Sequence, residues 1–371
     1  MRAIDQYAAT FGEDPGYLNW AAFGPISATA GAALRDTAEL LSTGRAEDVA
    51  AASEAGAAAA HEVAGLLGAP ADEVTLHPSS THALQQALAG LEGTVVASAA
   101  EFPSVTITLE RAASAAAGRL APRWIAPADT RVTPDAVAAA LDPTVTALVV
   151  SHVDFRSGYR ADLAALRDLL GPDRLLIVDA VQSFGVVDED WAAADVIVGH
   201  GYKWVRAGRG TGFARFTPQA RERIRPVLSG RIATSAKGLP TDALPDPIAS
   251  AQAYAVSAPD PFAAARLAAA SAEIRAAGVR DVAALLAERV DAVLAVADRH
   301  GIPVLSPREV ERRAGIVVFG VADPERLGAV LAAAGVGVTV HARAVRVAPH
   351  AGTTADTLGM LDAALADAAN R

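Results

Sequence analysis

The sequence predicts an α/β protein with a large domain built on a mostly parallel sheet and a small C-terminal α/β domain. Three observations favour this fold class. Short β-rich runs alternate with helical stretches between residues 74 and 216. Runs such as TALVV and LLIVD are almost continuously apolar, which suits parallel strands that helices cover on both faces. The chain has 371 residues, more than one compact core usually holds, which favours a second, smaller unit.

Helices are expected first along the chain. Ala-rich segments at 28–67 and 264–298 have helical spacing and few helix-breaking residues. Residues 33–68 predict two or three helices. The residues before them, 1–25, are expected to form an N-terminal segment that packs on the small domain or on a partner subunit.

Six runs rich in β-branched residues predict the strands of the large domain, which we place at residues 26–245. These runs are EVTLHP (73–78), GTVVASA (93–99), VTALVVSHV (145–153), RLLIVDAV (174–181), ADVIVGHG (194–201) and GTGFARF (210–216). The run DLAALRDLL (162–170) predicts a helix between two of them. This alternation is typical of strands joined by crossover helices.

The small domain is expected at residues 246–371, after the Pro-rich stretch LPTDALPDP (239–247). A long linking helix is predicted from Pro261 to about Ala277, and a second helix follows it. The runs GIVVFGV (315–321) and VGVTV (336–340) predict strands, with a helix in DPERLGAVLAAAG (323–335) between them.

Composition excludes several classes of function. The net charge is −10 and no block of basic residues occurs, which argues against nucleic acid as a partner. The absence of cysteine excludes disulfides, thiolate metal sites and a cysteine nucleophile, and no metal site is predicted. No apolar run is long enough to cross a membrane, and residues 1–17 lack the apolar core of a signal peptide. A cytoplasmic protein without a membrane partner is therefore expected.

Polar and aromatic residues follow five predicted strands. In an open parallel sheet, ligands bind beyond the carboxyl ends of the strands. The segments found there are HPSSTHAL (77–84), EFPS (101–104), SHVDFRSG (151–158), VDAVQSFG (178–185) and GHGYKW (199–204). A plain core would not need such residues at five strand ends, so we expect a site there.

Each segment alone has a simpler explanation. Asp179 ends a buried strand, where a carboxylate is costly without a cationic partner, but it also suits the N-cap of a helix. Ser79, Ser80 and Thr81 offer hydroxyl and N–H groups to an anion, or only cap a helix. Phe102 also suits a core. Lys203, which a glycine-rich turn follows, fits a surface cation, a phosphate clamp or a nucleophile.

The order of these segments is more informative than any one of them. The segments are, in order, a candidate phosphate-binding segment, an aromatic residue, an Asp with a Gln three residues on, and a Lys about twenty residues after the Asp. This order resembles that of the fold type I pyridoxal-phosphate enzymes. More narrowly, the chain is similar to the class V aminotransferases, a family with cysteine desulfurases, selenocysteine lyases, kynureninases and isopenicillin-N-epimerase-like proteins. The resemblance extends from YLNWAAFGP (17–25) to RVAPHAGTTADTLGMLDAAL (346–365). It implies a seven-stranded, mostly parallel sheet.

The resemblance implies roles for individual residues around pyridoxal 5'-phosphate. Lys203 would bind the cofactor covalently and then move the Cα proton, through aldimine and quinonoid intermediates. Asp179 would pair with the pyridine nitrogen, and Gln182 would lie near the phenolic oxygen. The other expected positions are Phe102 on the ring face, His152 near the ring, Ser80, Thr81, His82, His200 and Tyr202 around the phosphate, Arg346 on the substrate carboxylate and Asn19 near the substrate.

The resemblance also implies a homodimer with the active site at the subunit interface. Within residues 229–240, Arg231 or Ser235 is the candidate for reaching the phosphate of the neighbouring subunit. Departures from the family pattern bear on the reaction. Without cysteine there is no persulfide-forming nucleophile, and Phe155 and Tyr202 resemble kynureninase-like members, whereas Gln182 resembles desulfurases.

Several reactions share the expected first steps on a small α-amino acid. Transamination is the first expectation, because no residue stands out as the acid that a leaving group needs. A C–S β-lyase is the alternative, and an epimerase or kynureninase-like reaction is a further one. A cofactor-binding protein without turnover is disfavoured by the intact set of Lys203, Asp179 and Arg346. A nucleotide-binding protein is disfavoured because GRGTG (208–212) lacks the GK[ST] ending of a phosphate loop.

Overall fold

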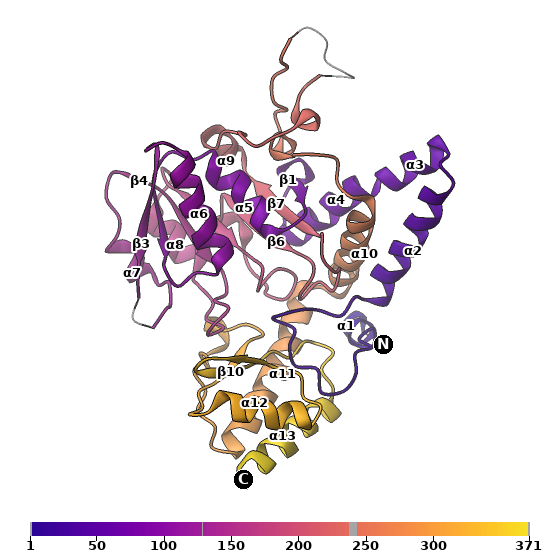
Figure 1. Cartoon of the computed structure of the whole chain (residues 1–371), viewed down its shortest axis with the longest axis vertical. Helices are drawn as coiled ribbons and strands as arrows, with labels where there is room; N and C mark the ends of the chain where they lie inside the picture. Colours follow the sequence, from indigo (N-terminus) through magenta and orange to yellow (C-terminus); the bar gives the residue numbers. More distant parts are fainter. Residues whose placement is uncertain (1, 128, 237–242, 370–371) are drawn as a thin grey trace.

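The computed structural model describes residues 2–127, 129–236 and 243–369. A seven-stranded sheet with helices on both faces forms the larger part of the molecule (Figure 1). A three-stranded sheet with three helices forms a smaller part below it in the same view. The predicted fold class, a mostly parallel seven-stranded sheet with a smaller C-terminal α/β unit, is therefore confirmed.

The large sheet has one reversed strand. Its strands are β1 (Val74–His77), β2 (Gly93–Ser98), β3 (Leu120–Ile125), β4 (Val145–Ser151), β5 (Leu175–Asp179), β6 (Val196–His200) and β7 (Gly212–Phe216). They lie in the order β1-β7-β6-β5-β4-β2-β3. The pairs from β6 to β3 are parallel, and β7 is antiparallel to both β1 and β6. The carboxyl ends of β2, β4, β5 and β6 consequently lie along one edge of the sheet.

Alternating apolar residues place a core on each face of this sheet. Val149, Ile177 and Val198 belong to the cluster that α5 (Ser80–Ala89) and α6 (Pro103–Ala115) cover. Their sequence neighbours Val150 and Val178 belong to the other cluster, because successive side chains of a strand point to opposite faces. Helices of that second face are α4 (Ala55–Leu67), α8 (Leu163–Leu170) and α10 (Pro261–Ala277).

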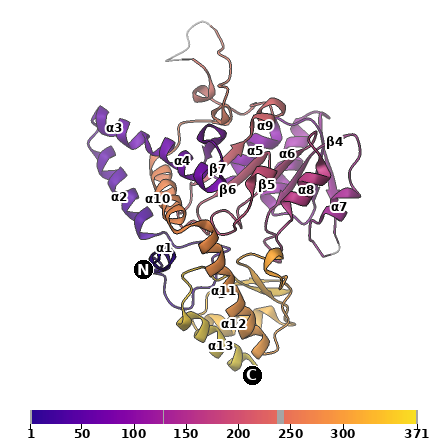
Figure 2. The same ribbon diagram turned by 180° about the vertical axis from the view of Figure 1, so that it is seen from behind.

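The remaining helices of the larger part lie at its ends and edges. They are α2 (Ala28–Ser42), α3 (Ala46–Ser53), α7 (Pro134–Ala138) and α9 (Pro218–Arg223). Residues 33–68 thus hold three helices. Helix α10 has the predicted bounds and packs against α2 and α4 (Figure 2). The limit we expect at residue 245, which assigns this helix to the small domain as a linker, stays a prediction.

The C-terminal part is a separate antiparallel sheet, in the order β8 (Val317–Phe319), β10 (Ala344–Val347), β9 (Thr339–His341). Its helices are α11 (Val279–Arg299), α12 (Pro324–Ala333) and α13 (Ala355–Ala369). The strand expected at 336–340 begins three residues later, and β10 was not expected.

The N-terminal segment joins several distant parts of the chain. Helix α1 (Ala3–Ala8) lies against α10 (Figures 1 and 2). Further on, Leu18 N–H donates to Gly337 O at 2.9 Å and Trp20 N–H donates to Ala348 O at 3.2 Å. These bonds tie the segment to the C-terminal part of the same chain.

Three expectations concern membrane-spanning helices, metal sites and contacts with a partner subunit. No helix within the described residues is long and apolar enough to cross a membrane. Those residues also contain no group of three or more metal-ligating side chains. Of the segment proposed to reach a neighbouring subunit, residues 237–240 lie outside the described residues, whereas Arg231 and Ser235 are described, and Ser235 N–H donates to Asp246 O at 2.8 Å.

Candidate active site

A cavity of about 270 Å³ lies where the carboxyl ends of β4, β5 and β6 meet the first turns of α5 and α6. All five strand-end segments that the sequence singles out contribute to it. Its lining residues are Ser79, Ser80, Thr81, Phe102, Ser104, Ser151, Val153, Phe155, Asp179, Val181, Gln182, His200, Tyr202, Lys203 and Arg209. We refer to it as the lysine cavity.

Lys203 follows β6 and is 6% exposed. Its Nζ lies 5.8 Å from the centre of the Phe102 ring and 5.7 Å from that of Tyr202. Burial lowers the pKa of Lys203 to about 8, and the positive charges of Arg346 and Arg209 act in the same direction, while Asp179 opposes them. A substantial fraction of this amine is therefore neutral near pH 8, as a nucleophilic lysine requires.

The backbone of Lys203 is held against the N-terminal segment. Gly24 N–H donates to Tyr202 O at 2.9 Å. A Cβ on Gly24 would lie 1.9 Å from Lys203 O, so only glycine allows this close approach. The chain before α2 thus forms a backbone support for the lysine.

The residues after Lys203 are fixed by both ends of the chain. Arg206 has a positive φ of 65°, donates to Thr10 Oγ1 at 2.8 Å, and lies 3.8 Å from the centre of the Phe11 ring. The His350 ring is 2.9 Å from Trp204 O, which accepts a hydrogen bond from Nε2. Arg206 is 3% exposed and anchors the N-terminal segment.

Asp179 is the last residue of β5 and is 5% exposed. Its Oδ1 accepts a hydrogen bond of 2.9 Å from Val181 N–H. Burial raises the pKa of Asp179 to about 6, against the opposing effects of that N–H and of Lys203. A desolvated carboxylate of this kind favours a cationic ligand in the cavity, because the ligand's charge would offset the loss of water.

Gln182 has both ends of its amide engaged. Trp204 Nε1 donates to Gln182 Oε1 at 2.9 Å, and Gln182 Nε2 donates to Ala21 O at 3.0 Å. One N–H of Nε2 remains beyond these bonds, because an amide nitrogen carries two. Gln182 can therefore offer the cavity a hydrogen-bond donor, whereas its acceptor, Oε1, already has a partner.

The start of α5 forms another side of the cavity. Ser79 is the N-cap, and its Oγ accepts from His82 N–H at 3.3 Å. Gly212 on β7 packs directly below, since a Cβ there would lie 2.5 Å from the Ser79 backbone. Thr81 Oγ1 donates to Ser104 Oγ at 3.0 Å, which links α5 to α6. Hydroxyls and first-turn N–H groups at such a helix start favour an anion.

Aromatic rings line the remaining sides. The Phe102 and Phe155 rings meet edge to face, with centres 5.1 Å apart and planes at 86°. The His200 and Tyr202 rings stack at 3.6 Å, and the guanidinium of Arg209 lies 4.8 Å from the Tyr202 ring centre. Burial and the charge of Lys203 lower the pKa of His200 well below its usual value, so its ring is neutral.

Arg346 and Asn19 lie next to the cavity and not in its lining. Arg346 Nη1 donates to Phe155 O at 3.1 Å, and its Nη2 donates to Thr339 Oγ1 at 3.3 Å. Thr339 Oγ1 in turn donates to Asn19 Oδ1 at 2.6 Å. The C-terminal sheet, the N-terminal segment and the Phe155 turn meet here.

Solved structures match this fold over almost the whole chain, although no family model and no curated protein matches the sequence. The apo cysteine desulfurase of Thermococcus onnurineus NA1 has a TM-score of 0.82 and 18% identity, covering 95% of this chain and 94% of that one. A C-DES mutant with glycine covalently linked to its PLP cofactor has a TM-score of 0.84 and 19% identity, covering 95% and 97%. Cysteine desulfurase CsdA from Escherichia coli has a TM-score of 0.82 and 15% identity, covering 98% of each chain.

The chain has the fold of these enzymes. The resemblance to the fold type I class V proteins, stated above on sequence motifs, is thereby confirmed for the fold. The site roles that it implies stay predictions, which the geometry supports to different degrees.

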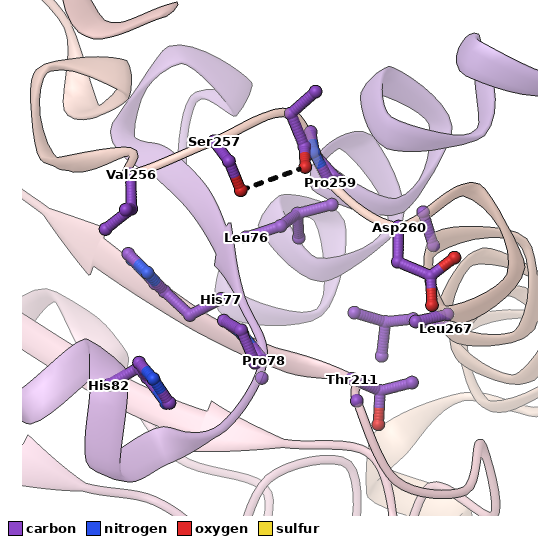
Figure 3. Close-up of a pocket in the computed structure, with 15 residues that line it drawn as sticks. Leu76, His77, Pro78, His82, Thr211, Val256, Ser257, Pro259, Asp260 and Leu267 are labelled. Atoms are coloured by element: carbon purple, nitrogen blue, oxygen red, sulfur yellow. Dashed lines mark hydrogen bonds between the residues drawn. The ribbon is translucent and has the colours of Figure 1, made fainter. Parts of the chain in front are cut away.

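Two predicted cofactor neighbours lie outside the lysine cavity. His152 is fully buried, with Nε2 3.0 Å from Glu189 Oε2 and its ring 5.1 Å from that of Trp191. His82 lines a second cavity of about 350 Å³ on the other side of the α5 start (Figure 3). In that view His77 and His82 lie on one side, and Ser257 and Asp260 lie on the other.

Sequence reasoning missed Ser151 and Glu101. Ser151 lines the cavity and pairs in register with Asp179 on the adjacent strand. Its N–H donates to Glu101 Oε1 at 3.0 Å, and its hydroxyl donates to Glu101 Oε2. Burial raises the pKa of Glu101 to about 7, while the bonds from Ser151 act against this. Ser151 and Asp179 end neighbouring strands, and this shared position was the sequence signal that could have indicated Ser151.

Proposed function

We propose that this chain is a pyridoxal-phosphate-dependent enzyme that acts on a small α-amino acid. One observation carries the proposal. A buried lysine with a lowered pKa and a buried carboxylate lie at the ends of adjacent parallel strands and line one cavity. Few other ligands would use both groups in this arrangement.

The residues present fit the cofactor group by group. Ser80, Thr81 and the α5 start suit its phosphate, with Tyr202 and Arg209 opposite, and Phe102 suits the face of its ring. Asp179 would pair with the ring nitrogen, which needs the counter-charge that this buried carboxylate provides. Bound pyridoxal phosphate supplies an electron-withdrawing ring that stabilises negative charge at the Cα atom of an amino acid.

The chain's own residues would then carry the steps. Arg346 would bind the substrate carboxylate, because its guanidinium is desolvated and the structure gives it no carboxylate partner among the described residues. Lys203 would take the Cα proton and return it, since its lowered pKa lets the amine exchange a proton near neutral pH. Gln182 would donate its remaining N–H toward the ring, and Asn19 would hold Thr339 in place.

Transamination is the proposed reaction. Apart from Asp179, the cavity lining contains no acidic side chain that could protonate a group leaving Cβ. A C–S β-lyase is the second candidate, and the structural neighbours support it at least as well. C-DES is described as a cystine C–S lyase. The absence of cysteine excludes neither reaction, because neither needs a catalytic thiol.

The first experiment tests the cofactor. Lys203 and Lys237 are the only lysines of the sequence, so each is a matched control for the other. The purified protein should be yellow, and borohydride reduction should attach the cofactor to the peptide that contains Lys203. Lys203→Ala should abolish the adduct and Lys237→Ala should preserve it. A colourless protein that takes up no pyridoxal phosphate would refute the proposal.

A second experiment separates the reactions. Amino acids are incubated with the loaded enzyme, with and without a keto-acid acceptor, and keto acids are measured. Product that forms only with the acceptor supports transamination. Product that forms without it, accompanied by sulfide from sulfur amino acids, would replace this assignment by the lyase.

We also propose a homodimer with the active site at its interface, following the family resemblance. Arg231 and Ser235 remain the candidates for contact with the neighbouring subunit. Light scattering should give twice the chain mass. A monomer that is fully active would contradict this part of the proposal.

A further inference from the structure

We propose that the lysine cavity accepts an amino acid with a second acidic group, which Arg156 and His341 bind while Arg346 binds the α-carboxylate. The assignment as a substrate site rests on the proposed function. Three observations support it: a shared contact at Phe155, one face of the C-terminal sheet, and a local excess of positive charge.

Phe155 connects the cavity to two arginines. Phe155 lines the cavity, and its ring meets that of Phe102, whose centre lies 5.8 Å from Lys203 Nζ. Its carbonyl oxygen accepts the bond from Arg346 Nη1 at 3.1 Å. The guanidinium carbon of Arg156 lies 5.2 Å from the centre of the same ring. A ligand that extends from Lys203 along the Phe102 and Phe155 rings therefore reaches both guanidinium groups.

The C-terminal sheet adds His341 to this side. Arg346 on β10 pairs with Thr339 on β9, and Ala344 pairs with His341. Residues two apart on a strand share a face, so Thr339, His341 and Arg346 project from the same face of the sheet. The bond from Arg346 to Thr339, and the bond from Thr339 to Asn19, show that this face is the one turned toward the N-terminal segment and Phe155.

Positive charge on this face lacks a local counter-charge. Among the described residues, no ion pair joins Arg156 or Arg346 to a carboxylate, and Arg346 Nε and His341 Nε2 are buried without a hydrogen-bond partner. The nearby carboxylate of Asp154 is used by its own turn, where it accepts from Ser157 N–H at 2.9 Å. Burial, Arg346 and Arg156, in that order, lower the pKa of His341, which places all three groups in one electrostatic environment.

One acidic group cannot satisfy this arrangement. Arg346 already has two of its N–H groups engaged with Phe155 and Thr339, and it suits a single carboxylate through the others. Arg156 is exposed, its guanidinium lies over the Phe155 ring, and no ion pair joins it to a carboxylate among the described residues, so it can meet a second anion. The matching ligand is an amino acid with an acidic side chain, carboxylate or sulfinate, or the corresponding dicarboxylic keto acid.

The test uses acids that lack an amine and so do not react with the cofactor. Binding of succinate, glutarate and butyrate to the loaded enzyme is measured by titration calorimetry. The better diacid should bind about ten- to a hundredfold more tightly than butyrate, the range expected of one added charged contact. Arg156→Ala, Arg156→Gln and His341→Ala should each remove most of this preference without changing butyrate binding. Arg326→Ala, an exposed arginine of α12, is the charge-matched control and should retain it.

Equal binding of the diacids and butyrate, no measurable diacid binding, or a preference that survives in both Arg156 variants would each overturn the subsite. Turnover of aspartate and of cysteine sulfinate is compared with that of norvaline. This comparison distinguishes a carboxylate from a sulfinate as the second acidic group. The same titrations on protein without added cofactor keep the two proposals apart. Failure to take up pyridoxal phosphate refutes the proposed function, whereas a yellow protein without diacid preference refutes only this inference.

Discussion

Two walls of the lysine cavity differ sharply in how they are held. The lysine wall, residues 200–206, is supported by both ends of the chain; Lys203 is 6% exposed and Trp204 is 1% exposed. The helix wall, formed by the first turns of α5 and α6, borders an open apolar groove. Phe102 is 41% exposed there, and Ile107 is 57% exposed. Lys203 thus lies on the buried side of the cavity, whereas the helix wall is the more exposed side.

The largest expected effect is on the lysine wall at Gly24. Gly24→Ala should destabilise the protein by about 3 kcal/mol or more, because the new Cβ would overlap Lys203 O and the backbone would have to move. Urea unfolding measures this loss, and the yield of borohydride-reduced adduct measures the displacement of Lys203. Gly12→Ala is the matched control, since nothing lies within 4 Å of its Cβ position. Equal stability of the two variants would show that the lysine wall is not rigid.

Arg206 should give the next largest effect. Arg206→Ala should cost about 3 kcal/mol through the lost bonds to Thr10 and the lost contact with Phe11. Arg206→Gly should cost about 1 kcal/mol less, because glycine adopts a φ of 65° without strain. Arg209→Ala, at an exposed neighbour whose guanidinium lies over the Tyr202 ring, should change the unfolding free energy by less than about 1 kcal/mol. The reverse ranking of Arg206 and Arg209 would contradict this comparison.

A smaller, pH-dependent effect is expected at Glu101, which lies just before α6 and accepts two hydrogen bonds from Ser151. Burial raises the pKa of Glu101 from 4.5 to about 7, so its ionised form weakens the folded state. This residue should therefore contribute stability below pH 4.5 that is lost as the pH rises through 7. From pH 5 to pH 8, the unfolding free energy of Glu101→Gln should rise relative to that of the wild-type protein by on the order of 2 kcal/mol. Urea unfolding at both values gives the difference, and an unchanged difference would exclude a raised pKa.

The smallest effect is expected on the helix wall at Ile107. Ile107→Ser should change the unfolding free energy by less than about 0.5 kcal/mol, since the side chain is mostly exposed already. Urea unfolding of the isolated variant measures it. A loss of several kcal/mol would mean that this side is covered in solution, as an interface between two copies would require.

Sequence reasoning recovered the residues whose position follows from strand ends. Lys203 and Asp179 end or follow buried parallel strands, and such strands bring their carboxyl ends to one edge. His152 shows the limit of this reasoning. It follows Ser151 directly, so alternation turns one side chain into the cavity and the other away from it, and composition does not indicate which. The roles of Arg206 and His350 depend on contacts between residues far apart in the sequence.

Strand β3 escaped prediction for a physical reason. Strand β3 contains Pro122 within LAPRWI, and proline normally argues against a strand. The structure places β3 at the edge of the sheet, where it pairs only with β2. At an edge, the N–H that Pro122 lacks need not deprive a neighbouring strand of a hydrogen bond. A single sequence does not reveal which strand is at the edge, so this strand could not be found from its residues.

The dependence of the lysine wall on both chain ends has a consequence for biosynthesis. Trp204 O receives its bond from His350, and Trp20 N–H donates to Ala348 O. A ribosome releases the chain from its N-terminus, so the large sheet can form while these late residues are still being made. The loop that carries Lys203 gains its last supports only when residue 350 has emerged. A nascent chain halted before that point should form its large sheet while the loop that carries Lys203 still lacks these two supports.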